Sequence, residues 1–284
     1  MKRSRSNLQT PQHKTTRQPN TKHKPTFDLQ RLREGIRPFR LHYFPRLRST
    51  NDHAAAMRAD GRLYAPAAVL TANQTAGRGR GQNRWFSNAG VLTVTFVMAI
   101  EEHLQPHQLP LVAGLAVRSA AEALLRVTPA GPHLPPVQLK WPNDVVCDGR
   151  KIAGLLCERV RKCDLIGVGL NVNLDPADAP APLADQLSSL AAIAGADMDM
   201  TDVLIALAGA IRRTASRRNQ TTFAEFLQDY DRHHVLLGRR VTVAVSHDQP
   251  AIVGRCEGLD HAGRLLVRDR QTLHRIISGH VTQW

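Results

Sequence analysis

The chain has 284 residues, enough for a full hydrophobic core in one large domain and a smaller second one. Its formal net charge of +14 suggests a polyanionic ligand, but residues 1–27 hold seven lysines and arginines and no acid, which leaves +7 on the rest. No window reaches the roughly 18 apolar residues of a membrane span, and the spacing of the four cysteines and 13 histidines argues against a zinc site.

Residues 1–38 are expected to form a disordered basic tail. The first 27 residues are rich in Thr, Gln, Asn and Pro and cannot bury enough apolar surface to offset the entropy lost on ordering. They lack the apolar core of a secretory signal, although an acid-free start leaves an organelle transit peptide open. The four cysteines indicate reduced thiols, so the expected location is cytoplasmic.

Strand and helix patterns alternate through residues 39–236, the expected large domain. Runs of β-branched and apolar residues predict strands, and small and apolar residues at helical spacing predict helices. The strands are expected at 68–73, 90–100, 137–147, 151–160 and 164–173, the helices at 109–127, 201–218 and 221–236, and a loop at 175–187. Asp148-Gly149 is a turn signal that joins the third and fourth strands into a hairpin.

The pattern changes after Gly238, and residues 237–284 are expected to form a second domain. Four short apolar runs, at 240–245, 251–256, 264–268 and 273–277, are separated by turn residues. Closely spaced short strands are typical of a small β-barrel. The fold class expected for the whole chain is therefore α+β, with a mixed sheet, flanking helices and an appended barrel.

The segment from Gly77 to Trp85 carries three arginines among three glycines and ends on a large aromatic residue. Glycine permits backbone conformations that a side chain would forbid, and arginine offers a rigid fork of donors to phosphate or carboxylate. The loop suits a compact anion, but taken alone it is as consistent with a solvated basic turn or a nucleic-acid-binding tract.

Three further polar clusters are candidates for a binding site. Ser49-Thr50-Asn51-Asp52 precedes a helical pattern, so an N-cap is the simpler reading and a pocket for a neutral polar head group is compatible with it. Lys140-Trp141-Pro142-Asn143-Asp144 stands at the end of a buried strand, as a turn or a site. Lys151 opens the partner strand, where a short turn would bring it near Asp144.

Five segments in register resemble the biotin–protein ligases. They are SerThrAsn at 49–51, GlnThrAlaGlyArgGlyArg at 74–80 with TrpPheSer at 85–87, LysTrpProAsnAsp at 140–144, LysIleAlaGlyLeuLeu at 151–156 and GlyValGlyLeuAsn at 167–171. The resemblance covers about residues 39–284. It implies a core similar to that of class II aminoacyl-tRNA synthetases, an SH3-like C-terminal barrel, and the monofunctional type without a DNA-binding domain.

The resemblance also implies a two-step reaction. Biotin and ATP with Mg²⁺ form biotinyl-5′-AMP, and biotin then passes to a lysine of a biotin carboxyl carrier protein, an acetyl-CoA carboxylase subunit. By motif, Lys151 and Arg80 are catalytic; biotin is contacted by Ser49, Thr50, Asn51, Gln74, Arg78, Gly79, Arg80 and Lys151; the nucleotide is contacted by Arg78, Trp85, Lys140, Asn143, Asp144 and Asn171. No residue is assigned as a metal ligand.

The expected assembly is a monomer or weak homodimer with no membrane association and no sequence-specific DNA binding. Arg48 stands where the family often has an acid, and Gly81-Gln82-Asn83 replaces a more arginine-rich run. Residues 279–284 lack the Glu and Arg common there, which puts a nucleotide contact from the small domain in doubt. The alternatives are a lipoate–protein ligase, which shares the adenylate chemistry, and a basic nucleic-acid-binding protein.

Overall fold

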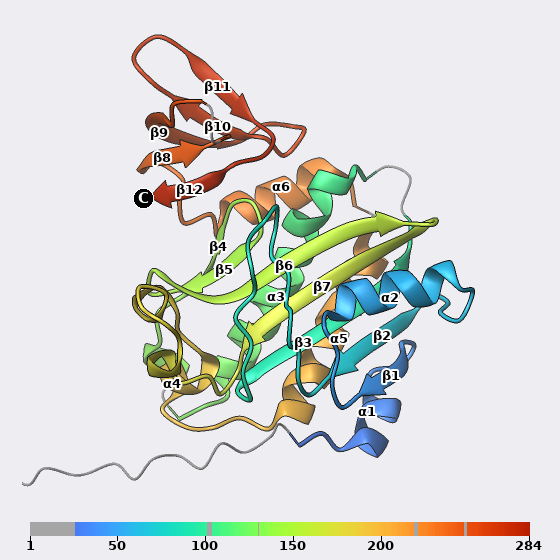
Figure 1. Ribbon diagram of the computed structural model, residues 1–284. Coiled ribbons are helices and arrows are strands. Elements are labelled where there is room, and N and C mark those ends of the chain that lie inside the picture. Colours follow the sequence, from blue (N-terminus) through green and yellow to red (C-terminus); the bar gives the residue numbers. More distant parts are fainter. Residues whose placement is uncertain (1–25, 101–103, 130, 219–220, 247–248) are drawn as a thin grey trace, which may run out of the picture.

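The computed structural model describes residues 26–100, 104–129, 131–218, 221–246 and 249–284 (Figure 1). A seven-stranded sheet forms the large domain, in the order β1-β2-β3-β7-β6-β5-β4, with β1 and β2 parallel and the other neighbours antiparallel. Its strands are β1 (Arg40–Phe44), β2 (Ala67–Thr71), β3 (Val91–Ala99), β4 (Val137–Lys140), β5 (Asp144–Cys147), β6 (Arg150–Val160) and β7 (Cys163–Asn171). The helices are α1 (Leu29–Gly35), α2 (Thr50–Ala59), α3 (Leu109–Arg126), α4 (Leu190–Ala194), α5 (Met200–Arg218) and α6 (Phe223–Asp231).

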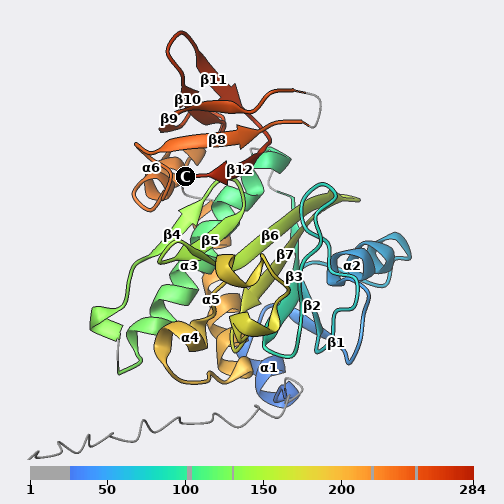
Figure 2. The same cartoon turned by 60° about the vertical axis from the view of Figure 1, so that its left-hand side comes forward.

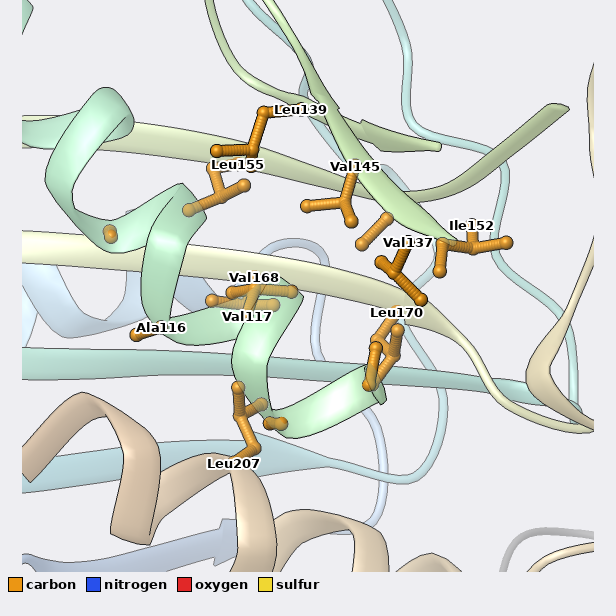
Figure 3. Close-up of a cluster of buried hydrophobic side chains, with 14 of the residues drawn as sticks. Ala116, Val117, Val137, Leu139, Val145, Ile152, Leu155, Val168, Leu170 and Leu207 are labelled. Carbon is orange, nitrogen blue, oxygen red and sulfur yellow. The ribbon is translucent and has the colours of Figure 1, made fainter. Parts of the chain in front are cut away.

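The two faces of the large sheet bury different surfaces. Side chains alternate along a strand, so Val168 and Leu170 of β7 point to the face covered by α3, where they meet Val117 (Figure 3). The opposite face packs against α2 through a smaller cluster that includes Met57 and Leu165. Further along that second face, the strands leave a hollow that holds the candidate site.

Helix α3 is a core helix. With the turn before it, it is long and apolar enough to cross a membrane by length and composition alone, a condition that our sequence inspection had found nowhere in the chain. In the fold, however, it lies between the sheet and α5, with most of its residues buried (Figure 2). Its apolar character is therefore explained by packing within the domain.

The small domain is a five-stranded antiparallel sheet in the order β11-β10-β9-β8-β12, and it fits an SH3-like domain. Its strands are β8 (Arg240–Ala244), β9 (Ile252–Leu259), β10 (Leu265–Arg268), β11 (Leu273–Ile276) and β12 (His280–Gln283). Four of them match the four predicted strands. The fifth, β12, was missed because Val281 is its only apolar residue.

Most of the predicted elements of the large domain are confirmed, with boundaries shifted by one or two residues. The predicted strand 137–147 is two strands, β4 and β5, separated by the turn at 141–143. The predicted helix 221–236 ends at Asp231, because residues 233–235 pair instead with Leu139 on the edge strand β4. The predicted loop 175–187 contains two short 3₁₀ turns.

The expected tail at 1–38 is wrong for its last part, and residues 1–25 lie outside the described residues. Asp28 caps α1 by accepting from the backbone N–H groups of Gln30 and Arg31. Leu32 and Ile36 are buried in the main core. A short helix with two buried anchors is therefore part of the large domain, despite the basic composition that precedes it.

A candidate active site

A strip of glycines forms the floor of the site. Gly167 and Gly169 of β7 pair across the sheet with Leu156 and Gly154 of β6, and all three glycines line one cavity. Because the side-chain period of a strand is two, the glycines of Gly-Val-Gly all face this cavity while the valine faces the core. A Cβ on Gly154 would lie 2.9 Å from the Trp85 ring and 3.0 Å from Lys151 Nζ. The site therefore requires glycine for close approach.

The start of helix α2 forms one wall. Ser49 is its N-cap and accepts from the Asp52 N–H, as the simpler reading predicted. Gln74 Oε1 accepts from the Thr50 N–H at 2.9 Å, which ties the helix start to the beginning of the arginine loop. All three side chains are buried and line the same cavity.

Asn51 is held rigidly by its neighbours. Its amide nitrogen donates to the Leu156 carbonyl at 3.0 Å and to Glu158 Oε2 at 2.7 Å, and its amide oxygen accepts from the Thr95 hydroxyl at 2.6 Å. Every strong hydrogen-bonding position of the amide thus has a protein partner, so Asn51 shapes the pocket as part of a fixed network.

The arginine loop folds back over the cavity. Gly79 N–H donates to the Asn83 carbonyl and Trp85 N–H donates to the Gly77 carbonyl, while Gly81 takes a φ of 63°. A Cβ on Gly77 would lie 2.7 Å from Gln74 Nε2 and 2.8 Å from the Trp85 carbonyl. Glycine at 77 and 81 is therefore needed for close packing and for the left-handed turn.

Arg78 fastens this loop to the domain. Its guanidinium forms ion pairs with Asp52 Oδ1 at 2.7 Å and Glu158 Oε2 at 2.9 Å. Burial acts against the charged form, but the bonds to Glu158 and Asp52 outweigh it and raise the pKa of Arg78. With two carboxylates beside it, Arg78 holds the loop rather than offering a free positive charge.

Lys151 and Asp144 meet as the short hairpin turn predicted. Asp148 and Gly149 both take positive φ, 50° and 72°, the geometry of a two-residue hairpin turn. Lys151 Nζ lies 2.6 Å from Asp144 Oδ1 and 5.3 Å from the centre of the Trp85 ring. The indole N–H of Trp85 is buried without a hydrogen-bond partner in the described part of the chain, so a donor is available inside the cavity.

The small domain closes the remaining side. Arg80 donates to the Gly279 carbonyl, and its guanidinium lies 6.0 Å from the centre of the Trp141 ring. His280 and Val281 of β12 line the same cavity. The doubt about a contribution from this domain is thus resolved in geometry, since two of its residues reach the site.

The site is electropositive and partly dry. Burial lowers the pKa of Lys140, with nearby Asp144 opposing and Lys151 reinforcing the shift. Burial likewise lowers the pKa of Arg80, again opposed by Asp144. Burial and the neighbouring Lys140 lower the pKa of His280, which favours a neutral imidazole at the cavity mouth. Cations in such surroundings are stabilised when an anionic ligand enters.

The structure brings together all but one of the predicted site residues. The cavity, about 860 Å³ of space open to solvent, is lined by Ser49, Thr50, Asn51, Gln74, Arg78, Gly79, Arg80, Trp85, Lys140, Asn143, Asp144 and Lys151. Asn171 does not line it. Its amide donates to the carbonyls of Ser188, at 2.9 Å, and Lys151, at 3.3 Å, so it positions the Lys151 backbone instead.

Several functional neighbours escaped the sequence reasoning. Glu158 and Thr95 fix Asn51 and the loop, and His280 comes from the small domain. The alternation Gly-Val-Gly could have revealed the floor, but nothing in the sequence places Thr95, 44 residues from Asn51, beside it. Among the described residues there is no group of three or more His, Cys, Asp or Glu side chains able to hold a metal ion.

Together, the α+β fold with its SH3-like domain and the cationic, glycine-floored cavity define a ligase core that binds a small molecule and an anion. A family model described as "Biotin/lipoate A/B protein ligase family" matches residues 43–175. The chain belongs to the biotin–protein ligases of this family.

Relatives and solved structures support this assignment. The biotin--[acetyl-CoA-carboxylase] ligase of Mycobacterium tuberculosis is 32% identical over 222 residues, covering 76% of this chain and 79% of that protein. The protein of the same name from Paracoccus denitrificans is 32% identical over 232 residues, covering 78% of this chain and 92% of that protein. Biotin protein ligase from Aquifex aeolicus, solved in complex with biotin and ATP, superposes with a TM-score of 0.73 at 28% identity, covering 86% of this chain and 97% of that one.

Proposed function

We propose that this chain is an ATP-dependent ligase that forms biotinyl-5′-AMP and transfers biotin to a lysine of a carboxylase carrier subunit. One observation carries the proposal beyond family membership. Cations from three separate segments, Arg80, Lys140 and Lys151, line the same cavity as the neutral polar wall at the start of α2. A carboxylate and a polyphosphate repel each other, and such a cavity holds both at once.

In the first step, an oxygen of the biotin carboxylate attacks the α-phosphorus of ATP. The bond between that phosphorus and the bridging oxygen breaks, and pyrophosphate leaves. Lys151 and Arg80 stabilise the negative charge that develops on the phosphoryl oxygens. This displacement needs no general acid, in keeping with a cavity whose one histidine sits at the mouth.

In the second step, the amine of the carrier lysine attacks the acyl carbon of the mixed anhydride. The C–O bond to phosphate breaks, AMP leaves, and the amine proton passes to solvent. The arginine loop, fastened by Arg78 and by the Arg80 contact with the small domain, excludes water and so protects the anhydride until then.

The individual roles follow from the geometry of the walls. Ser49, Thr50 and Gln74 border the biotin head, with Asn51 shaping it. Lys140, Asn143 and Trp85 border the nucleotide. Mg²⁺ would enter with the ATP phosphates, and Asp144 is the carboxylate of the cavity lining that fits it. When bound, the ion supplies charge neutralisation at the phosphates.

We also propose the finer points of organisation. The large domain ends at about residue 236 and the small one follows from 237. The protein acts in the cytoplasm, as a monomer or weak homodimer, on a biotin carboxyl carrier protein and without sequence-specific DNA binding. The four cysteines, all unpaired in the structure, support a reducing compartment.

A direct test is mass spectrometry of a carrier domain after incubation with the full chain. The proposal predicts a biotin adduct on one lysine only when both biotin and ATP are present. A lipoate-supplied reaction is the parallel arm. Modification by lipoate but not by biotin would replace the proposal with the lipoate–protein ligase alternative.

A further inference from the structure

A second site candidate lies far from the catalytic cavity. An open groove between α1, β1 and α5 is lined by Arg33, Arg37, Arg40 and Arg212 together with Pro38, Phe39 and Leu41. Both views place this corner at the end of the large domain away from the small one (Figures 1 and 2). The proposed ligase activity makes no use of it.

The four arginines of this groove are uncompensated. All four are exposed, and no acidic residue lines the groove. Within the described ranges, none of the four forms an ion pair, whereas neighbouring Arg31 is paired with Asp202 at 2.5 Å. Glu34 is the adjacent acid on α1, so the local balance remains strongly positive. A patch of this kind attracts anions.

The groove is a fixed part of the fold. A Cβ on Gly35 would lie 2.7 Å from Ile205 Cδ1, which shows how closely α1 packs on α5. Phe39 is buried at the floor and contacts Phe96 edge-on at 5.0 Å between ring centres. Arg212 Nη1 donates to the Arg37 carbonyl at 2.9 Å, linking α5 to the segment before β1. The arginines are therefore presented from a rigid base.

We propose that this groove binds the phosphodiester backbone of nucleic acid, without sequence preference. Guanidinium forks match phosphate oxygens in pairs, and several forks along one groove suit a repeating anion better than a single one. The aromatic side chain on the floor is buried, so the patch offers little to a lipid surface. In sequence, the seven cations of residues 1–27 come just before α1 and would extend the same attraction.

The test is fluorescence anisotropy of the full chain with a labelled single-stranded DNA of about 20 nucleotides, titrated between about 50 and 200 mM salt. The groove variant is Arg33→Gln/Arg37→Gln/Arg40→Gln, which leaves Arg212 to hold the Arg37 carbonyl. The control is Arg240→Gln/Arg270→Gln/Arg275→Gln, three exposed arginines of the small domain, so both variants lose the same charge.

The groove variant should bind with a plot of log affinity against log salt that is shallower by about 2, since each lost phosphate contact on a single strand removes about 0.7. Its affinity near 0.1 M salt should fall about 100-fold. The control should keep the wild-type slope. Thermal midpoints check folding, and if the triple variant is unstable, Arg33→Gln alone should lower the slope by about 0.7.

Two results would overturn the inference. Equal losses in the groove and control variants would mean that only net charge matters. Loss of binding to phosphatidylserine vesicles, with DNA binding unchanged, would assign the groove to an acidic lipid surface. Neither readout involves biotin or ATP, so the outcome is independent of the proposed ligase activity.

Discussion

Gly167→Ala should disable the biotin pocket while leaving the fold recognisable. The added Cβ would lie 2.9 Å from Asn51 Cγ, closer still to its amide oxygen, and 3.0 Å from the Leu156 carbonyl. The carbonyl belongs to the neighbouring strand and cannot move, so Asn51 must retreat by on the order of 1 Å to restore van der Waals contact.

That retreat stretches three hydrogen bonds of 2.6–3.0 Å, to Thr95, Glu158 and the Leu156 carbonyl, beyond bonding range. Two neutral bonds contribute about 1 kcal/mol each and the bond to the carboxylate about 2, so the loss of unfolding free energy is roughly 4 kcal/mol. The assays are urea unfolding and calorimetric titration with biotin.

Gly209→Ala is the matched control. Gly209 lies inside α5, and its added Cβ would meet only the flexible end of Arg213, at 3.3 Å. Alanine favours a helix interior, so this variant should gain about 0.5–1 kcal/mol. If Gly167→Ala kept wild-type stability and biotin affinity, the rigid Asn51 network would not be what shapes the pocket.

Three further changes test other parts of the account. Arg80→Gly removes the contact of the loop with the Gly279 carbonyl, so adenylate should still form but should escape and label lysines indiscriminately; intact retention of the adenylate in a filter assay would contradict this. Asn171→Ala frees the Lys151 carbonyl, so we expect kcat to fall about 10-fold with little change in the KM for biotin, whereas a selective rise in the KM for ATP would point to direct nucleotide contact. Bonds from His274 and two backbone N–H groups lower the pKa of Asp269 to about 2, so its ionised form stabilises the fold above the unfolded pKa of about 4, and the stability gap between wild type and Asp269→Asn should close as pH falls from about 4 to 2; a gap independent of pH would rule out this ion pair as its cause.

The sequence was most informative where local pattern and chemistry coincide. Strands such as β3 and the buried helix α3 follow directly from periodicity, and Asp148-Gly149 predicted the short turn that brings Lys151 to Asp144. The site motifs could be recognised because each combines residues with a distinct chemical use, such as the glycine-spaced arginines.

What the sequence did not reveal depends on tertiary contacts. Strand β1 mixes Arg40 and His42 with apolar residues and forms because β2 supplies its ladder. The role of Asn171 was misjudged because its partners, Lys151 and Ser188, come close only after the strands pair. His280 reaches the cavity through the packing of two domains, which no local pattern encodes.

The most direct test of the central claim is a single-turnover measurement of biotinyl-5′-AMP formation by wild type and Lys151→Ala. Removing one preorganised donor from a charge-stabilising site typically costs about 10²–10³ in rate, so adenylate formation should fall by at least about 100-fold while biotin still binds. A rate within about twofold of wild type would contradict the claim that cations gathered in this cavity drive the reaction.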